Sequence, residues 1–243
     1  MRIPLAMLVI TLAAPAAADP AGDKVLLEVD DSMNRAKSQH FLYDAVTQEP
    51  GRGEKKLGLE VWMKGDKRLT AFTEPADLKG TKVLVVSPTE MYAYLPAFGK
   101  VRRIASHTND QSAFGMAFSQ DDLADQRYSD EYGAVLAGED EKQIKLVLTP
   151  KAGQKPAYGK IEIAAQKGDS KVPEELKYYA ASGTLVKTET RTGYKCEGNV
   201  CVPGELKMTD HSKGGLWTRI SMRNWKLNEE FSEDLLSKRN LDK

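Results

Sequence analysis

The sequence predicts a mainly β protein of the α+β class, in which a large curved antiparallel sheet forms an unclosed β-barrel with a helical lid over an apolar cavity. Many short runs rich in Val, Ile, Thr and Tyr alternate polar with apolar residues, and Gly, Pro, Asn or Asp separate them. Only one long segment has helical periodicity. A sheet of about a dozen strands twists and curls, and one helix with one insertion is too little to fill its concave side. The unfilled space would suit a ligand of low polarity.

Residues 1–18 have the pattern of a cleavable export signal. Arg2 supplies the positive end, an apolar run follows over 3–12, and Ala16 and Ala18 are the small residues before a cut at Asp19. The run is about ten residues long, whereas a membrane-spanning helix needs roughly twenty. We therefore expect an exported, soluble protein that is either secreted or periplasmic, with residues 19–243 forming a single domain and no lipid-anchoring cysteine near the cut.

The first element after the signal is expected to be a helix over residues 22–37. Val25, Leu26, Val29 and Met33 recur in it at helical spacing, with acidic residues early and basic residues late. Val29 and Met33 are candidates to face the cavity, although any packed helix shows such a stripe.

The strands are expected to follow as antiparallel hairpins. Turn signals such as Gly65-Asp66 and Ser182-Gly183 separate several of them. The end of the chain, over residues 231–241, is expected to form a helical turn that caps an edge of the sheet. The candidate strands are 38–48, 55–64, 67–73, 81–87, 90–95, 100–105, 127–137, 142–149, 157–166, 174–181, 184–195, 200–210 and 216–228.

One segment, over residues 108–125, breaks the strand pattern. It contains Phe114, Met116, Phe118 and Leu123 among small and acidic residues, and we interpret it as a loop followed by a short helix. These four side chains either line the mouth of the cavity and contact a ligand, or pack as an ordinary lid. Met and Phe suit a flexible apolar ligand, and Gly115 allows motion.

The two cysteines, Cys196 and Cys201, are expected to form a structural disulfide at a hairpin tip. Four residues separate them, among them the turn signal Gly198-Asn199, and export places the pair in an oxidising compartment. A redox-active pair would normally have the closer Cys-x-x-Cys spacing at a helix start, and a metal site would need more ligands.

Charge balance argues against a nucleic-acid-binding protein. The chain has 35 basic and 35 acidic residues, without the basic excess that such proteins show. Beyond the signal, no segment is apolar enough to span a membrane.

Motifs for catalysis, cofactors or metals are not found in the sequence. Ser182 lies in a turn rather than in a Gly-x-Ser-x-Gly elbow, and no phosphate loop or cofactor fingerprint is present. Asp121 and Asp122 are expected to point different ways and decorate the lid rather than form a catalytic pair. The three histidines lack metal-ligand spacing; they are His40, His107 and His211. We expect no enzyme activity and no cofactor.

Three stretches, in order and spacing, resemble the outer-membrane lipoprotein-sorting protein family, the relatives of the periplasmic lipoprotein carriers. They are residues 59–81 (LEVWMKGDKRLTAFTEPADLKGT), 91–104 (MYAYLPAFGKVRRI) and 118–123 (FSQDDL). The C-terminal residues 231–241 (FSEDLLSKRNL) are similar to the family's C-terminus. Two features depart from the family's pattern. Met116-Ala117 stand just before the Phe-Ser of the third stretch, where family members commonly have small and acidic residues. The cysteine hairpin is the second, because many members lack one.

The resemblance implies an unclosed β-barrel, a helical lid and an apolar cavity that carries a lipid or a lipoprotein acyl chain through the periplasm of a Gram-negative envelope. It also implies an envelope partner, since members often accompany inner-membrane transporters of the resistance-nodulation-division (RND) type. We expect a monomeric carrier that binds an acyl chain and hands it to such a partner. A lipid-binding sensor or adaptor that regulates a membrane protein is the alternative; a lipid hydrolase and a ligand-free structural protein find less support.

Overall fold

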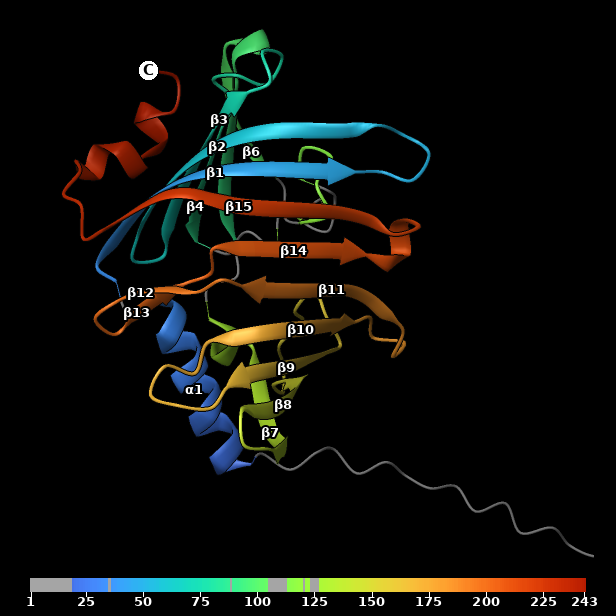
Figure 1. The fold of residues 1–243 in the computed structure, drawn as a ribbon. Coiled ribbons are helices and arrows are strands. Elements are labelled where there is room, and N and C mark those ends of the chain that lie inside the picture. Colours follow the sequence, from blue (N-terminus) through green and yellow to red (C-terminus); the bar gives the residue numbers. More distant parts are fainter. Residues whose placement is uncertain (1–18, 35, 88, 105–112, 120, 123–126) are drawn as a thin grey trace, which may run out of the picture.

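The computed structural model describes residues 19–34, 36–87, 89–104, 113–119, 121–122 and 127–243. Thirteen strands form one sheet in the order β6-β5-β4-β3-β2-β1-β15-β14-β11-β10-β9-β8-β7, and each neighbouring pair is antiparallel (Figure 1). A separate hairpin pairs β12 with β13. The expected signal peptide, residues 1–18, lies outside the described residues.

The helix and strand bounds follow the hydrophobic pattern closely. The helix is α1 (Pro20–Asn34), and short 3-10 turns include η1 (Pro96–Phe98), η3 (Tyr128–Asp130), η4 (His211–Lys213), η5 (Glu233–Leu236) and η6 (Lys238–Asn240). The strands are β1 (Ser38–Gln48), β2 (Glu54–Lys64), β3 (Lys67–Glu74), β4 (Lys82–Ser87), β5 (Glu90–Leu95), β6 (Lys100–Ile104), β7 (Tyr132–Glu139), β8 (Gln143–Pro150), β9 (Lys160–Gln166), β10 (Pro173–Tyr179), β11 (Leu185–Thr192), β12 (Lys195–Glu197), β13 (Val200–Val202), β14 (Glu205–Asp210) and β15 (Leu216–Leu227).

The predicted fold class is confirmed: the sheet is an unclosed barrel. Its two edges are β6 and β7, and these strands follow one another in the chain. The connection between β6 and β7 therefore leads from one edge of the sheet to the other. The described part of this connection is where the sequence predicts a lid.

Three predicted elements differ from the structure in instructive ways. The single strand expected over 200–210 is split into β13 and β14 at Pro203-Gly204, because proline donates no ladder hydrogen bond and a side chain at 204 would meet the Gly193 carbonyl oxygen at 2.6 Å. The strand expected over 127–137 begins as η3. The helix ends at Asn34, not at residue 37, because β1 begins at Ser38.

The free edge of β7 is covered by α1. Asp23 accepts a hydrogen bond from the Ala134 N–H (2.7 Å), and Asp19 accepts one from the Leu136 N–H (3.1 Å). Gly22 permits this approach, since a Cβ there would lie 2.5 Å from the Ala134 carbonyl oxygen. The helix thus satisfies backbone donors that an open sheet edge would leave exposed.

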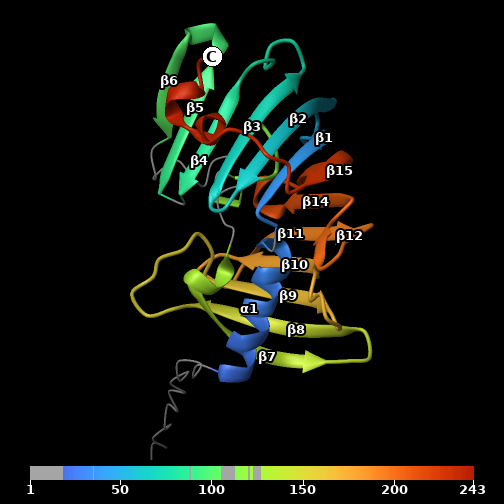
Figure 2. The ribbon, with the colours of Figure 1, turned by 90° about the vertical axis from the view of Figure 1, so that its left-hand side faces the viewer.

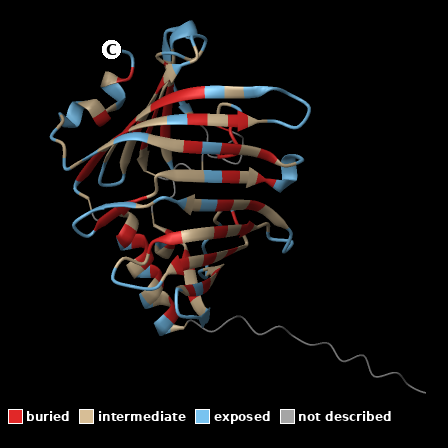
Figure 3. Ribbon diagram, in the orientation of Figure 1, coloured by how far each residue is buried: buried red, intermediate tan, exposed pale blue. Residues whose placement is uncertain are grey.

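Two hydrophobic clusters lie on opposite faces of the sheet. The larger cluster lies on what we call the inner face, where α1 and residues 113–118 pack; Leu26, Val29 and Phe72 belong to it. Buried and less buried positions alternate along many of the strands, as the colour bands of Figure 3 show. This alternation is what a sheet with one covered face requires.

The C-terminal segment packs on the outer face, and the prediction that it caps an edge is wrong. Leu236 and Leu241 are buried there against Leu69, Leu84 and Tyr92. Figure 2 shows the segment crossing β3, β4 and β5. Apolar side chains on the outer face of these strands need a cover, and the chain end supplies it.

Among the described residues, no helix combines the length and the hydropathy that a membrane span would need.

Candidate ligand-binding cavity

A cavity of about 220 Å³ lies on the inner face, between the sheet, the end of α1 and residues 113–119 and 121–122. Its walls are mostly apolar, and β1 to β4 supply one side of it. For comparison, an engineered apolar cavity of about 150 Å³ holds benzene, and pockets for drug-sized ligands begin near about 300 Å³. As it stands, the cavity therefore fits part of a long acyl chain but not all of it. The apolar lining consists of Met33, Phe41, Leu59, Val61, Met63, Phe72, Val83, Phe114, Met116, Phe118, Val202, Pro203, Leu206 and Ile220.

Four of the six residues proposed from the sequence as ligand contacts line this cavity: Met33, Phe114, Met116 and Phe118. Val29 is fully buried in the inner-face core and is not among the lining residues. The sixth, Leu123, lies outside the described residues. Sequence reasoning therefore located one wall of the cavity, and the structure adds the walls built by strands.

Residues 113–119 and 121–122, which we call the cover segment, lie against the inner face. Met116, Ala117 and Phe118 are buried. The Ala113 N–H donates to the Phe118 carbonyl (2.9 Å), which closes a tight loop. Phe114 and Gly115 have φ angles of 54° and 79° at its tip, where Gly115 adopts this conformation at little cost.

The middle of the cover segment is fixed to the centre of the sheet by two threonines. The Thr218 hydroxyl of β15 accepts the Ala117 N–H (2.8 Å) and donates to the Thr47 hydroxyl of β1 (2.8 Å). Thr47 and Thr218 are directly opposed in the strand pairing. Because both threonines are buried, these bonds form away from water and hold the segment at a defined depth.

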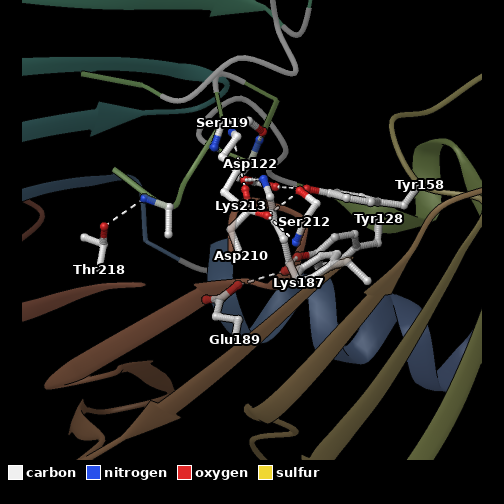
Figure 4. A network of polar contacts seen from close by, with 12 residues as sticks. Ser119, Asp122, Tyr128, Tyr158, Lys187, Glu189, Asp210, Ser212, Lys213 and Thr218 are labelled. Carbon is white, nitrogen blue, oxygen red and sulfur yellow. Dashed lines mark hydrogen bonds and ion pairs between the residues drawn. The ribbon is translucent and has the colours of Figure 1, made fainter. Parts of the chain in front are cut away.

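The end of the cover segment is held by a buried ion pair. The Lys187 Nζ of β11 lies 2.5 Å from Asp122 Oδ2, and the two side chains are 7% and 4% exposed. Tyr158 donates its hydroxyl to Asp122 Oδ1 (2.5 Å), and the Ser119 N–H donates to Oδ2 (2.6 Å). Figure 4 shows these partners converging on the carboxylate. The expectation that Asp122 decorates the lid surface is therefore wrong, since its partners come from distant strands and loops.

A second buried pair lies beside the first on β11. Arg191 Nε donates to Glu189 Oε1 (2.7 Å), and the Tyr178 hydroxyl donates to Glu189 Oε2 (2.8 Å). The Tyr178 and Tyr128 hydroxyls lie 3.0 Å apart. Burial and the neighbouring Glu189 raise the pKa of Tyr178 well above its usual value, so the phenol stays protonated and remains a donor. Asp122 of the first pair and both members of the second line the cavity.

The disulfide predicted between Cys196 and Cys201 is present in the structure. It joins directly opposed residues of the β12–β13 hairpin, and Cys201, Val202 and Pro203 line the cavity. The hairpin also contacts α1. The sequence predicted the bridge but not that its hairpin closes one end of the cavity.

Replacing both cysteines by serine is expected to lower the free energy of unfolding by about 2 kcal/mol, because the bridge restricts a short loop of the unfolded chain. The measurement is urea denaturation of the oxidised protein and of the Cys196→Ser/Cys201→Ser variant. Reductant should lower the stability of the parent to that of the variant and leave the variant unchanged. Equal stability of the two proteins without reductant would contradict the prediction.

A family model described as "Uncharacterized protein" matches residues 64–243. The chain belongs to this family. The match includes the cover segment, the disulfide hairpin and all strands from β3 onward. No curated protein matches the chain significantly.

Solved structures place this family member in a known fold. A DUF1329 family protein from Desulfovibrio piger has a TM-score of 0.83 at 22% identity, over 91% of this chain and 98% of that one. A domain described as a "putative outer membrane lipoprotein-sorting protein domain", from Vibrio parahaemolyticus, has a TM-score of 0.82 at 21% identity, over 92% of this chain and 99% of that one. A LolA superfamily protein from Nitrosomonas europaea has a TM-score of 0.73 at 18% identity, over 92% and 99%. The resemblance to the lipoprotein-sorting family is thus confirmed at the level of the fold.

The polar groups of the cavity are the functional candidates that sequence reasoning missed. Tyr43, Arg68 and Arg191 line it, and each stands in a strand that alternates normally. The two buried positions of β11 are the charged residues Lys187 and Glu189, and Arg191 lies on the same face of the strand. A charged row on a covered face indicates paired or functional charges.

Proposed function

We propose that this protein is a periplasmic carrier that binds a lipid or lipoprotein acyl chain in its inner-face cavity. The observation that carries the proposal is the apolar cavity, bounded by an unclosed sheet on one side and by the cover segment on the other. Burial of each methylene contributes about 0.8 kcal/mol, so even part of a chain would be held firmly. The fold shared with a named lipoprotein-sorting domain supports the same assignment.

Loading and release require the cover segment to move, in this proposal. The cavity accommodates only part of a long chain, and Met116 and Phe118 occupy adjacent space on the inner face. Phe114 packs against Phe72 with 4.5 Å between ring centroids, an apolar contact that an acyl chain could replace. Displacing these side chains would enlarge the cavity without changing the sheet.

Release also requires a partner that opens the cover segment or offers the chain a better site. We propose an envelope partner, with an inner-membrane transporter of the RND type as the specific candidate, and a monomeric carrier exported through a cleaved signal at residues 1–18. The apolar signal sequence supports export.

The testing experiment is lipid mass spectrometry of an organic extract of the protein purified from the periplasm. An acyl lipid or lipopeptide in stoichiometric amount is expected, and it would name the ligand class. A protein that is empty on purification, and still empty after incubation with labelled envelope lipids, would contradict the carrier assignment. Turnover of an acyl ester by the pure protein would contradict the proposal that the carrier has no enzyme activity.

A further inference from the structure

The turn between β5 and β6 exposes a run of apolar residues outside the cavity. Pro96, Ala97 and Phe98 are all exposed, and the exposed fraction of Phe98 is 62%. Among the described residues, Leu27 is the other large apolar side chain that is exposed. None of residues 96–100 lines the cavity. Because such a run loses favourable burial in water, it indicates a contact surface.

We propose that residues 95–102, which we call the β5–β6 tip, bind the surface of a bilayer that contains anionic lipids. In this contact Phe98 enters the interfacial layer, and Lys100 and Arg102 bind lipid phosphates. The inference goes beyond the carrier function proposed above, because it concerns how the protein meets a membrane and not what its cavity holds.

The β5–β6 tip has a defined conformation. Pro96 begins η1, and Gly99 ends it with a φ of 56°, a left-handed conformation that glycine adopts easily. The Gly99 N–H donates to the Leu95 and Pro96 carbonyls, at 3.1 Å each. Leu95 and Lys100 are directly opposed in the strand pairing. Because these bonds close the turn, presenting Phe98 to a surface costs little conformational entropy.

The tip lies at one extremity of the molecule. Figures 1 and 2, whose views differ by 90°, both show the turn after β5 at the upper end of the molecule. Figure 3 shows the same turn as exposed. A flat surface can therefore reach Phe98 without first meeting the body of the sheet.

Two cations stand beside Phe98. The Arg102 guanidinium lies over the ring, 5.5 Å from its centroid, and Lys100 is exposed at the start of β6. Within the described part of the chain, neither cation takes part in an ion pair. Arg103 differs, since it donates to the Thr89 carbonyl (3.2 Å) at the other end of the hairpin. The positive charge of Lys100 and Arg102 is thus available to an anionic surface.

A bilayer fits the tip better than a protein partner does. A stable protein interface covers about 800 Å² on each side, which is more than one hairpin turn provides. The turn that packs beside the tip, over residues 75–80, carries one acidic and one basic residue, Asp77 and Lys79, so it adds no net charge. One apolar ring flanked by cations is sufficient for weak, reversible binding to an anionic membrane.

The test is flotation of the protein, purified from the periplasm, with vesicles of two compositions. One set is phosphatidylcholine alone, and the other mixes it with an equal part of the anionic lipid phosphatidylglycerol. We expect the parent protein to bind the anionic vesicles about tenfold or more tightly, because each cation favours an anionic surface. Raising the salt concentration to about 0.5 M should remove most of that preference.

Two variants locate the contact. Phe98→Ser should weaken binding to the anionic vesicles about fivefold or more, because the serine has no ring to bury. Lys100→Gln/Arg102→Gln should abolish the preference for anionic vesicles. Phe98→Trp reports insertion directly: its extra indole emission, relative to the parent with three tryptophans, should shift to shorter wavelength and be quenched by lipids brominated in the acyl chain.

Two matched controls remove the same chemistry elsewhere. Leu27→Ser removes the exposed leucine of α1, and Lys145→Gln/Lys195→Gln removes two exposed lysines from β8 and β12. Both proteins should bind vesicles as the parent does.

The outcomes separate this proposal from the carrier function. A parent protein that binds neither kind of vesicle would overturn the membrane contact, and so would binding that Phe98→Ser and the double variant of the tip leave unchanged. Capture of a periplasmic protein by the parent but not by Phe98→Ser, without vesicle binding, would reassign the tip to a protein contact. Phe98→Ser should bind dodecanoate as the parent does in calorimetry. A parent that binds vesicles through the tip but no dodecanoate would count against the carrier function alone.

Discussion

Replacing Lys187 by Met is expected to lower the free energy of unfolding by about 3–5 kcal/mol, because it leaves the Asp122 carboxylate buried without its cation. Met retains most of the apolar volume of the lysine stem, so lost packing contributes little. The measurement is urea denaturation followed by circular dichroism near pH 7. Hydrogen exchange of the Ala117 amide would report in parallel whether the cover segment opens more often.

Two variants control for this result. Lys177→Met removes a lysine that is 39% exposed and paired with Glu175 on β10, and should cost less than about 1 kcal/mol. Asp122→Asn/Lys187→Met removes both charges and should recover much of the loss, since the amide oxygen of the new side chain can still accept from Tyr158. If Lys187→Met were as mild as Lys177→Met, the pair would not anchor the cover segment.

Replacing Thr70 by Trp is expected to weaken the binding of an acyl ligand at least about tenfold, a change of ~1.4 kcal/mol. Thr70 lines the cavity from β3, and an indole there would extend into space that the chain would occupy. Because the cavity is open space, the fold should tolerate the larger side chain better than a filled core would. Binding is measured by calorimetry with dodecanoate, together with a urea midpoint for each protein.

The matched control is Thr190→Trp, which makes the same substitution at an exposed position of β11. It should leave both affinity and stability close to those of the parent. Unchanged affinity in a folded Thr70→Trp protein would show that ligand binds elsewhere, and the cavity would lose its proposed role.

The strands were predictable because period-two alternation is a local property of the chain. The run from Leu57 to Met63 in β2 shows this, with one face in the inner core and Trp62 on the outer face. The disulfide was predictable for the same reason, as two cysteines flanked a short turn. Element ends that depend on a single local cue were harder to place: Pro203 ended one strand, and Asn34 ended the helix earlier than its charges indicated.

The outer-face position of the chain end could not be read from its own residues. Leu236 and Leu241 have an apolar spacing that fits an edge cap as well as a face cover. What decides between them is the apolar outer surface at Leu69, Leu84 and Tyr92, which belongs to strands far earlier in the chain. Asp122 is a similar case, because Lys187 and Tyr158 are distant in sequence.

The sequence by itself determined the β-rich class, most strand positions, the disulfide and one apolar wall of the cavity, since each follows from residue types at short spacing. Only the tertiary structure decided which charges meet inside. Lys187, Glu189 and Arg191 look like an ordinary alternating strand until the cover segment and α1 close over that face. Burial then changes their role, because an ion pair that water would screen on the surface becomes an anchor for the cover segment once it is enclosed.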